Sequence, residues 1–275
     1  MAEANLFVPL WQDSGISNEI YHGSLALRRL IGEEVKFHTV SVPEHGLLMT
    51  ERGVYGYATV LNQLLLVQKA LAEGRPATVF TVGGGCGVEV PILAYLAKIY
   101  PELAIFWFDA HGDINSPESS PSKYFHGMPL RFLLEHIEDN AISEIVSGEI
   151  SPANVLLLGT RDLDAPEMDY LRTRKVHLLK PLECDLRHLE YEPIFSTAEK
   201  RRAYIHIDLD CIDPKEYKNV KCPAKDGLSI RRICKLIGVI SKRMNVVGFS
   251  VLENVETDQT ELKKLSPIMD WALKI

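Results

Sequence analysis

The sequence predicts an α/β protein in which helices cover both faces of a largely parallel sheet. Three observations support this prediction. Strand-like and helical segments alternate eight times along the chain. The 275 residues, 46% of them hydrophobic, are enough to bury a sizeable core. Several apolar runs end abruptly in acidic side chains, and ligands bind at the carboxyl ends of the strands in sheets of this kind.

Each predicted strand is a short segment rich in apolar and β-branched residues. The eight strands are Leu6–Leu10, Val35–Val42, Ala77–Val82, Leu103–Phe108, Asn154–Gly159, Val176–Leu179, the segment from Tyr204 into Asp208, and Val246–Leu252.

The predicted helices lie between these strands, and Gly74, Pro76 and Ser229 supply end signals for two of them. The helices are Ser17–Leu30, Tyr55–Glu73, Val90–Ile99, Leu130–Asp139, Met168–Thr173, one within Leu186–Lys200, Ile230–Arg243, and one from Thr257 onward that is interrupted at Pro267. Pro43–Gly53, Ser116–Lys123 and Lys215–Gly227 are predicted loops.

Composition narrows the class of protein. The net charge of −7 and the pI near 5.7 argue against nucleic acid or an anionic membrane as partner. No apolar run approaches the span of a bilayer. The five cysteines are scattered without a CxxC spacing, which indicates reduced thiols in a cytoplasmic protein. No linker divides the chain, so we expect a single domain over residues 1–275.

The segment Phe108–Asn115 is the first candidate site. Asp109, His111 and Asp113 follow a buried strand and alternate along the chain, so an extended backbone would point all three the same way. Ligands of this kind suit a divalent metal. The alternative is a polar turn after a strand.

A second strand also ends in carboxylates, Asp208 and Asp210, with Asp213-Pro214 as the exit turn. Unpaired carboxylates in an apolar sheet are costly. A pair of metal ions that share these carboxylates would neutralise them, and a salt-bridged pair is the alternative.

The glycine-rich run Gly83–Gly87 lies between a strand and a helix. It has neither the GxGxxG spacing nor the Lys-Ser/Thr of a phosphate-binding loop, which disfavours a nucleotide site. We expect the glycines to let the backbone pass close to a metal or substrate site. Cys86 and Glu89 are the side chains there that could bind a metal, although a lone Cys is more often a small buried hydrophobe.

Other polar residues follow the remaining strands. His126 is either a general acid or base, since His titrates near neutrality, or an idle loop residue. Asp162 or Glu167 either contacts a ligand or caps the following helix. Glu253 stands at the carboxyl end of the last strand.

Taken together, the segments Asp-Ala-His-x-Asp-x-Asn and Asp-x-Asp-x-x-Asp-Pro resemble the ureohydrolase family of arginases, agmatinases and formimidoylglutamases. The resemblance runs from about Val79 to Glu256. It implies a three-layer α/β/α sandwich around a mainly parallel eight-stranded sheet. It also implies two Mn²⁺ ions per chain and a homo-oligomer, a trimer or hexamer.

The resemblance also assigns roles to individual residues. Glu253 would pair with the substrate's guanidinium, His126 would shuttle protons, and Asp113 would both bind metal and hold the nucleophile. The metal ligands it implies are Asp109, His111, Asp113, Asp208 and Asp210. The arginase branch reads the substrate's α-carboxylate and α-amino group through positions that match Asn115, Ser122, Asp162, Asp164 and Glu167.

Three positions depart from the family pattern. Cys86 replaces the first metal-binding histidine of the family, Gly85 replaces the acid beside it, and His206 stands where Ser is usual. Thiolate is softer than manganese prefers and would favour Zn²⁺, and Glu89 is an alternative oxygen ligand.

The expected activity is hydrolysis of L-arginine to L-ornithine and urea by a metal-bridging hydroxide. The alternatives are another guanidino or formimidoyl substrate (agmatine, a guanidino acid or formimidoylglutamate) and a catalytically silent, arginase-like binding protein with an impaired first metal site.

Overall fold

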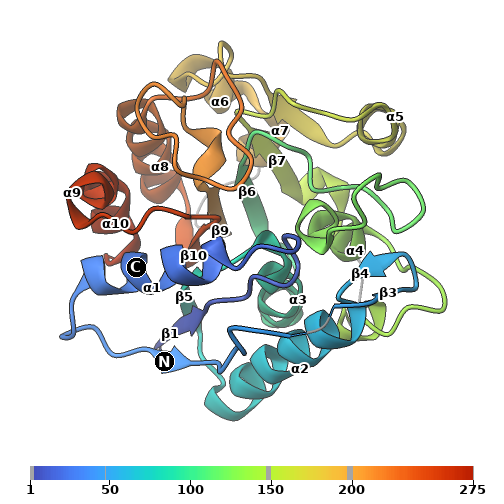
Figure 1. Ribbon diagram of the computed structural model, residues 1–275. Helices are drawn as coiled ribbons and strands as arrows, with labels where there is room; N and C mark the ends of the chain where they lie inside the picture. Colours follow the sequence, from blue (N-terminus) through green and yellow to red (C-terminus); the bar gives the residue numbers. More distant parts are fainter. Residues whose placement is uncertain (1–2, 47, 147–149, 197–200, 275) are drawn as a thin grey trace.

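The computed structural model describes residues 3–46, 48–146, 150–196 and 201–274 (Figure 1). Within these residues, eight strands form one sheet in the order β2-β1-β5-β10-β9-β6-β7-β8, and every neighbouring pair is parallel. The strands are β1 (Glu3–Val8), β2 (His38–Thr39), β5 (Thr78–Gly83), β6 (Ala104–Phe108), β7 (Val155–Leu158), β8 (His177–Leu179), β9 (Arg202–Asp208) and β10 (Asn245–Leu252). The prediction of an eight-stranded parallel sheet is confirmed.

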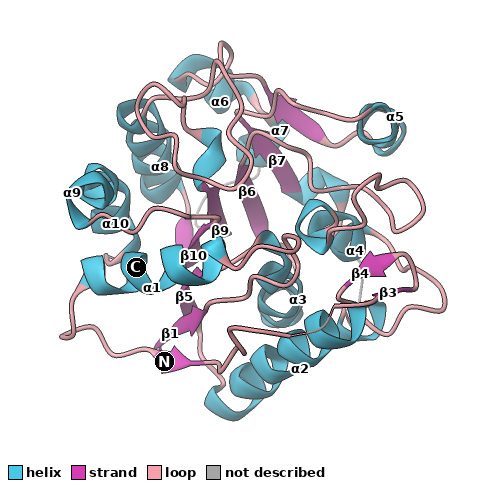
Figure 2. Ribbon diagram, in the orientation of Figure 1, coloured by secondary structure: helices cyan, strands magenta, loops and turns pink. Residues whose placement is uncertain are grey.

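Helices cover both faces of this sheet and make a three-layer sandwich (Figure 2). One face carries α2 (Tyr57–Gly74), α3 (Glu89–Ile99), α4 (Pro129–Leu134) and α5 (Ala165–Arg174). The other carries α1 (Glu19–Ile31), α6 (Leu186–Tyr191), α7 (Pro193–Ser196), α8 (Ile230–Arg243), α9 (Gln259–Leu262) and α10 (Ser266–Ala272).

Strand β6 shows why the central strands are continuously apolar. Ile105 and Trp107 belong to the core under α2 and α3, whereas Phe106 and Phe108 belong to the core under α8. Successive side chains of a strand point to opposite faces, and here both faces are fully buried. An apolar residue is therefore needed at every position up to the point where the strand leaves the core.

Two predictions near the N-terminus are wrong in extent. The predicted strand Val35–Val42 is reduced to β2, an edge strand that pairs with β1. The predicted loop Pro43–Gly53 contains β3 (Thr50–Glu51), which pairs antiparallel with β4 (Val54–Tyr55). Arg52 and Gly53 between these strands both have positive φ, the backbone of a tight hairpin turn, but Arg-Gly is not a typical sequence for that turn.

Three predicted helices end differently. The helix expected over Leu130–Asp139 stops at Leu134, because Glu135 adopts an extended backbone. The segment Leu186–Lys200 splits into α6 and α7 at Pro193, and its residues 197–200 lie outside the described part of the chain. The helix expected from Thr257 onward is two helices, because α9 ends at Leu262 and α10 begins at Ser266. Pro267 lies in the first turn of α10, where a missing N–H costs nothing.

None of the described helices combines enough length with enough apolar character to cross a membrane.

Candidate metal centre

The candidate site lies at the carboxyl ends of β5, β6, β9 and β10, which follow one another across the middle of the sheet. The turn Cys86–Val88 follows β5, Asp109 follows β6, Asp208 ends β9 and Glu253 follows β10. Parallel strands present all these ends at one edge, so residues more than 160 positions apart in sequence come together. The backbone amide of Cys86, for example, donates a hydrogen bond to Glu253 Oε1 at 3.1 Å, across 167 positions.

One group of metal-binding side chains comprises Asp109, His111 and Asp210, whose ligand atoms all lie within 4.8 Å of one another. His111 Nδ1 is 2.9 Å from Asp210 Oδ2 and 3.5 Å from Asp109 Oδ1. Backbone amides orient both carboxylates: that of Ala110 donates to Asp210 Oδ1 and that of His111 to Asp109 Oδ1.

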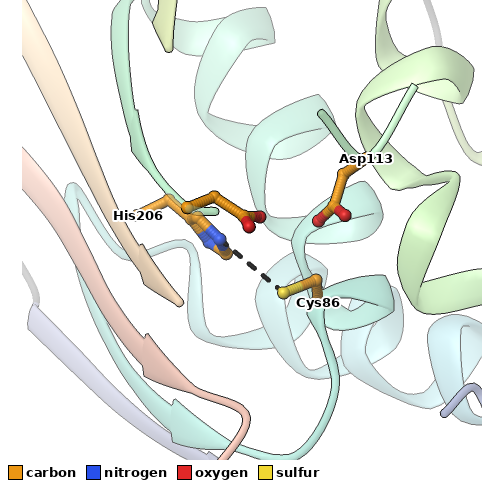
Figure 3. Close-up of side chains that lie close together, drawn as sticks. Cys86, Asp113 and His206 are labelled. Atoms are coloured by element: carbon orange, nitrogen blue, oxygen red, sulfur yellow. Dashed lines mark hydrogen bonds between the residues drawn. The ribbon is translucent and has the colours of Figure 1, made fainter. Parts of the chain in front are cut away.

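A second group comprises Cys86, Asp109, Asp113 and His206, again with all ligand atoms within 4.8 Å. Figure 3 shows the thiol of Cys86 and the imidazole of His206 directed toward each other, with the Asp113 carboxylate pointing toward the same space. Asp208 adjoins this group, since the Cys86 thiol donates to its Oδ2 at 3.2 Å. Asp109 belongs to both groups, so the two sites share one carboxylate.

The backbone around the acidic residues differs from the expected extended segment. Strand β6 ends at Phe108, and Asp113 has a φ of 52°, so simple alternation does not explain why the three side chains converge. Glu253 also has a left-handed backbone, with φ of 66°. Such conformations are uncommon for residues other than glycine and cluster at functional sites.

The charges of the site are poorly balanced by the protein. Burial disfavours ionisation of Asp109, but hydrogen bonds from His111 and its charge lower the pKa of Asp109 to about 2. Burial, reinforced by neighbouring carboxylates, raises the pKa of Asp113 and that of Asp208 well above the usual range. Asp113 Oδ2 and Glu253 Oε2 are buried and have no hydrogen-bond partner among the described residues. Unpartnered buried oxygens amid crowded carboxylates fit a site that receives cations.

An N-terminal loop that we did not predict as part of the site also reaches it. Asp13 is fully buried, and its Oδ2 accepts a hydrogen bond from the Gly87 amide at 3.0 Å. The Ser14 hydroxyl lies 3.3 Å from Glu253 Oε1. Asp13 and Ser14 follow strand β1, so the signal was present: they too are polar residues after a strand end.

This loop explains part of the glycine run. A Cβ atom on Gly84 would lie 1.6 Å from the Leu10 carbonyl oxygen, and one on Gly85 would lie 2.2 Å from Asp13 Oδ1. The glycines therefore permit close passage of the backbone, as expected, but against the N-terminal loop that borders the site.

His126 lies where a proton carrier would be useful. Its Nδ1 is 3.2 Å from Glu253 Oε1, and its side chain remains 17% exposed. Burial favours the neutral imidazole, but Glu253 outweighs this effect and raises the pKa of His126 above its ordinary value.

A cavity of about 120 Å³ opens beside the two groups. Asp164 and Glu167 cap α5 through a reciprocal capping box, so the helix-capping role considered for Glu167 is confirmed. Both residues also line the cavity. Asp162 does not line it: its side chain is 70% exposed and its Oδ2 is 3.9 Å from His111 Nε2. The cavity is lined by His111, Asp113, Asn115, Ser120, Pro121, Ser122, His126, Gly127, Asp164, Glu167, Asp208, Asp210 and Cys222.

Glu89, which the sequence offered as an alternative metal ligand, lies behind His206 instead. Its Oε1 is 2.9 Å from His206 Nδ1, and Ser250 also donates to it. None of the metal-binding groups in the described part of the chain includes Glu89. His206, which the sequence marked only as a departure from Ser, is the residue that Glu89 contacts.

Comparison with known proteins shows which family the chain belongs to. A sequence model described as the arginase family matches residues 26–261. The chain belongs to the arginase family. Its similarity to a Staphylococcus aureus (strain COL) arginase is 30% identity over 189 residues, which cover 66% of this chain and 62% of that arginase. A Bacillus caldovelox arginase is 33% identical over 171 residues, which cover 60% of this chain and 56% of the relative.

Solved structures of the arginase family share the fold. An Entamoeba histolytica arginase in complex with L-ornithine has a TM-score of 0.85 and 18% identity, covering 100% of this chain and 99% of that one. The Bacillus caldovelox arginase has a TM-score of 0.83 and 21% identity, covering 100% of this chain and 98% of that one. A Bacillus subtilis formimidoylglutamase has a TM-score of 0.73 and 16% identity, covering 99% of this chain and 86% of that one. The predicted family and three-layer fold are therefore confirmed.

Proposed function

We propose that this protein hydrolyses a guanidino compound, and that L-arginine is the substrate, with L-ornithine and urea as products. The observation that carries the proposal is the shared position of Asp109 in two adjacent groups of metal-binding side chains. A carboxylate shared by both groups would let two bound cations act on one reacting group. The arginases among the relatives support the choice of substrate.

Each group would hold one divalent cation, for which Mn²⁺ is our proposal from the family resemblance. Asp109, His111 and Asp210 would hold one ion, and Asp109, Asp113, Asp208 and Cys86 are candidates for the other. When bound, two such cations make water acidic enough to serve as a nucleophile near neutral pH.

The protein's own side chains would then position the substrate and move protons. Asp113 has an unpartnered buried oxygen, which would accept the proton of the nucleophile and pass it to the leaving nitrogen. Glu253 also has a free Oε2, and it would orient the planar guanidinium through charge-assisted hydrogen bonds. His126 would carry the proton between this buried pair and solvent, because it touches Glu253 and is partly exposed.

The tail of the substrate would lie in the cavity. Asn115, Ser122, Asp164 and Glu167 line it and would contact the α-amino and α-carboxylate groups, with Asp162 near its rim. L-Arginine has both groups, whereas agmatine has the amino group but no carboxylate. We propose this set as the determinant of tail preference.

We extend the proposal to the whole molecule. Residues 1–275 would form a single arginase-like domain that acts in the cytoplasm as a homo-oligomer on a small molecule, without nucleic acid or membrane as partner. The five cysteines, all unpaired, are consistent with a reducing compartment.

The test is release of product by the purified protein loaded with Mn²⁺, and in parallel with Zn²⁺ or Co²⁺. Urea is measured with L-arginine, agmatine and 4-guanidinobutyrate, and formamide is measured with formimidoylglutamate. Asp208→Ala should abolish turnover, whereas Asp169→Ala, at an exposed position on α5, should not change it. Wild-type turnover in the Asp208 variant, or no product from any substrate with two metals bound, would contradict the proposal.

A further inference from the structure

We propose that His206 and Cys86 together replace the missing histidine as a soft pair of ligands, so that the first metal position is built for a thiophilic ion such as Zn²⁺ or Co²⁺. The inference rests on the proposed function for the presence of a metal at this position, and it goes further by naming the ligands. Cys86 and His206 belong to one group with Asp109 and Asp113, and all four are buried.

The position of His206 in the sheet makes this possible. Along β9, Ile205 and Ile207 point into the core under α8, whereas Tyr204 belongs to the opposite core. The period of two therefore places His206 on the same face as Tyr204 and as Asp208, the last residue of β9. In register it lies between Trp107 of β6 and Ser250 of β10. An imidazole on this face reaches the turn after β5, which a serine there would be too short to do.

The ring of His206 is held in one orientation. It stacks on Trp107 with ring centroids 3.7 Å apart and an interplanar angle of 19°. Its Nδ1 is 2.9 Å from Glu89 Oε1. Because a carboxylate only accepts hydrogen bonds, Nδ1 carries the proton and the Nε2 lone pair faces Cys86. A carboxylate behind the distal nitrogen is the usual support of a metal-bound histidine.

The distance between the two ligand atoms fits a shared ion. Cys86 Sγ and His206 Nε2 are 3.7 Å apart (Figure 3). Bond lengths of about 2.3 Å to sulfur and 2.0–2.1 Å to nitrogen at a tetrahedral angle separate the two atoms by about 3.6 Å. The observed separation is long for a strong hydrogen bond and close to the spacing of two ligands on one ion.

The chemistry of the pair then determines metal preference. Manganese prefers oxygen ligands and is the weakest binder of the divalent first-row series, whereas thiolate and imidazole favour Zn²⁺ and Co²⁺. The other group, Asp109, His111 and Asp210, has only oxygen and imidazole ligands and no sulfur. The two positions should therefore differ in metal preference within one molecule.

Titration of the metal-free protein with Co²⁺ tests this inference without any assay of turnover. Two cobalt ions should bind per chain, and a near-ultraviolet band from one thiolate–cobalt bond should appear. Cys86→Ser should lose that band and Cys184→Ser, at another buried thiol remote from the site, should keep it. Two bound cobalt ions without a thiolate band in the wild-type protein would overturn the inference, and selective alkylation of Cys86 would then indicate a nucleophilic thiol.

The role of His206 needs its own variants. Glu89→Gln should weaken cobalt at the thiolate position by about 10–100-fold, and His206→Ser should weaken it at least as much. Unchanged cobalt affinity in these variants, with the far-ultraviolet circular dichroism of the wild type, would exclude His206 as a ligand. The double variant Cys86→His/His206→Ser should lose the band and bind Mn²⁺ more tightly relative to Co²⁺ than the wild type does.

The two proposals can fail separately. A thiolate–cobalt band without product from any guanidino substrate would retain this ligand set and reject the proposed hydrolysis. Product from a protein with two cobalt ions and no thiolate–cobalt band would retain the proposed hydrolysis and reject this ligand set.

Discussion

Asp13 Oδ2 accepts a hydrogen bond from the backbone amide of Gly87 at 3.0 Å, and this contact joins the loop after β1 to the turn that carries Cys86. The two residues are 74 positions apart. Both are buried, so the bond is shielded from water. It therefore fixes the turn beside the candidate metal ligands, and the N-terminal loop is part of the site's framework.

Removal of this acceptor should destabilise the protein. Asp13→Ala leaves the buried amide of Gly87 without a partner, at a cost of about 1–3 kcal/mol in the free energy of unfolding. Asp13→Asn keeps an acceptor oxygen and should lose less. Urea denaturation of both variants checks this, and equal stability of the alanine variant and wild type would show that the bond contributes nothing.

Asp13 should also make stability depend on pH. Burial, and then repulsion from Glu253, raise the pKa of Asp13 from 3.8 to about 7 in the folded protein, and the facing His126 opposes them. A carboxyl whose folded pKa is raised adds stability below its unfolded pKa and loses it as the pH rises through the folded pKa. The stability of the wild type relative to Asp13→Asn should therefore fall from about pH 4 to about pH 7 and then level off. Urea unfolding of both metal-free proteins at several pH values measures this. A difference in unfolding free energy that does not change with pH would contradict the prediction.

The two metal positions should respond differently to loss of a carboxylate. Asp210 belongs to one group and Asp109 to both, so Asp210→Asn should lose one metal per chain and Asp109→Asn should lose both. Elemental analysis after dialysis measures this directly. Loss of the same number of ions from both variants would argue against a shared Asp109.

Glu253 should matter for substrate rather than for metal. Glu253→Gln removes the charge that would pair with guanidinium, and we expect kcat/KM to fall about 10²–10³-fold with two metals still bound. Glu261→Gln, at a glutamate paired with Lys264 at the surface, is the matched control. The ligand atoms of Cys86, Asp208 and Glu253 also lie within 4.8 Å of one another, so loss of metal from the Glu253 variant would mean that Glu253 is itself a ligand.

Asn115 should read the tail of the substrate. Its side chain donates to Asp164 Oδ2 at 3.1 Å and lines the cavity. Asn115→Ala should raise KM for L-arginine by more than KM for agmatine, because only arginine has the α-carboxylate that this amide would bind. An equal change for both substrates would place Asn115 outside the tail site.

Much of the fold was predictable because the central strands are buried on both faces. A short, continuously apolar segment such as Ala104–Phe108 is typical of a strand buried on both faces. The helix Ile230–Arg243 has the bounds that its periodicity and the Ser229 cap predict. The errors fall at the edge of the sheet, in turns and at the ends of helices, where fewer neighbours constrain the chain. Strand β2 has one neighbour, and the Arg52-Gly53 hairpin lacks a typical turn sequence.

By itself, the sequence determined the alternation of strands and helices, the family resemblance and most of the acidic residues at the strand ends, because apolar runs and spaced carboxylates are local patterns. Only the tertiary structure decided which of those residues meet. The order of the strands brings β5, β6, β9 and β10 together, and with them Cys86, Asp109 and His206. Packing of Glu89 and Trp107 directs one nitrogen of His206 toward the thiol, and the N-terminal loop adds Asp13 to the site. Contacts such as these, between residues 74 to 120 positions apart, depend on how the whole sheet is assembled, and no local pattern in the sequence specifies them.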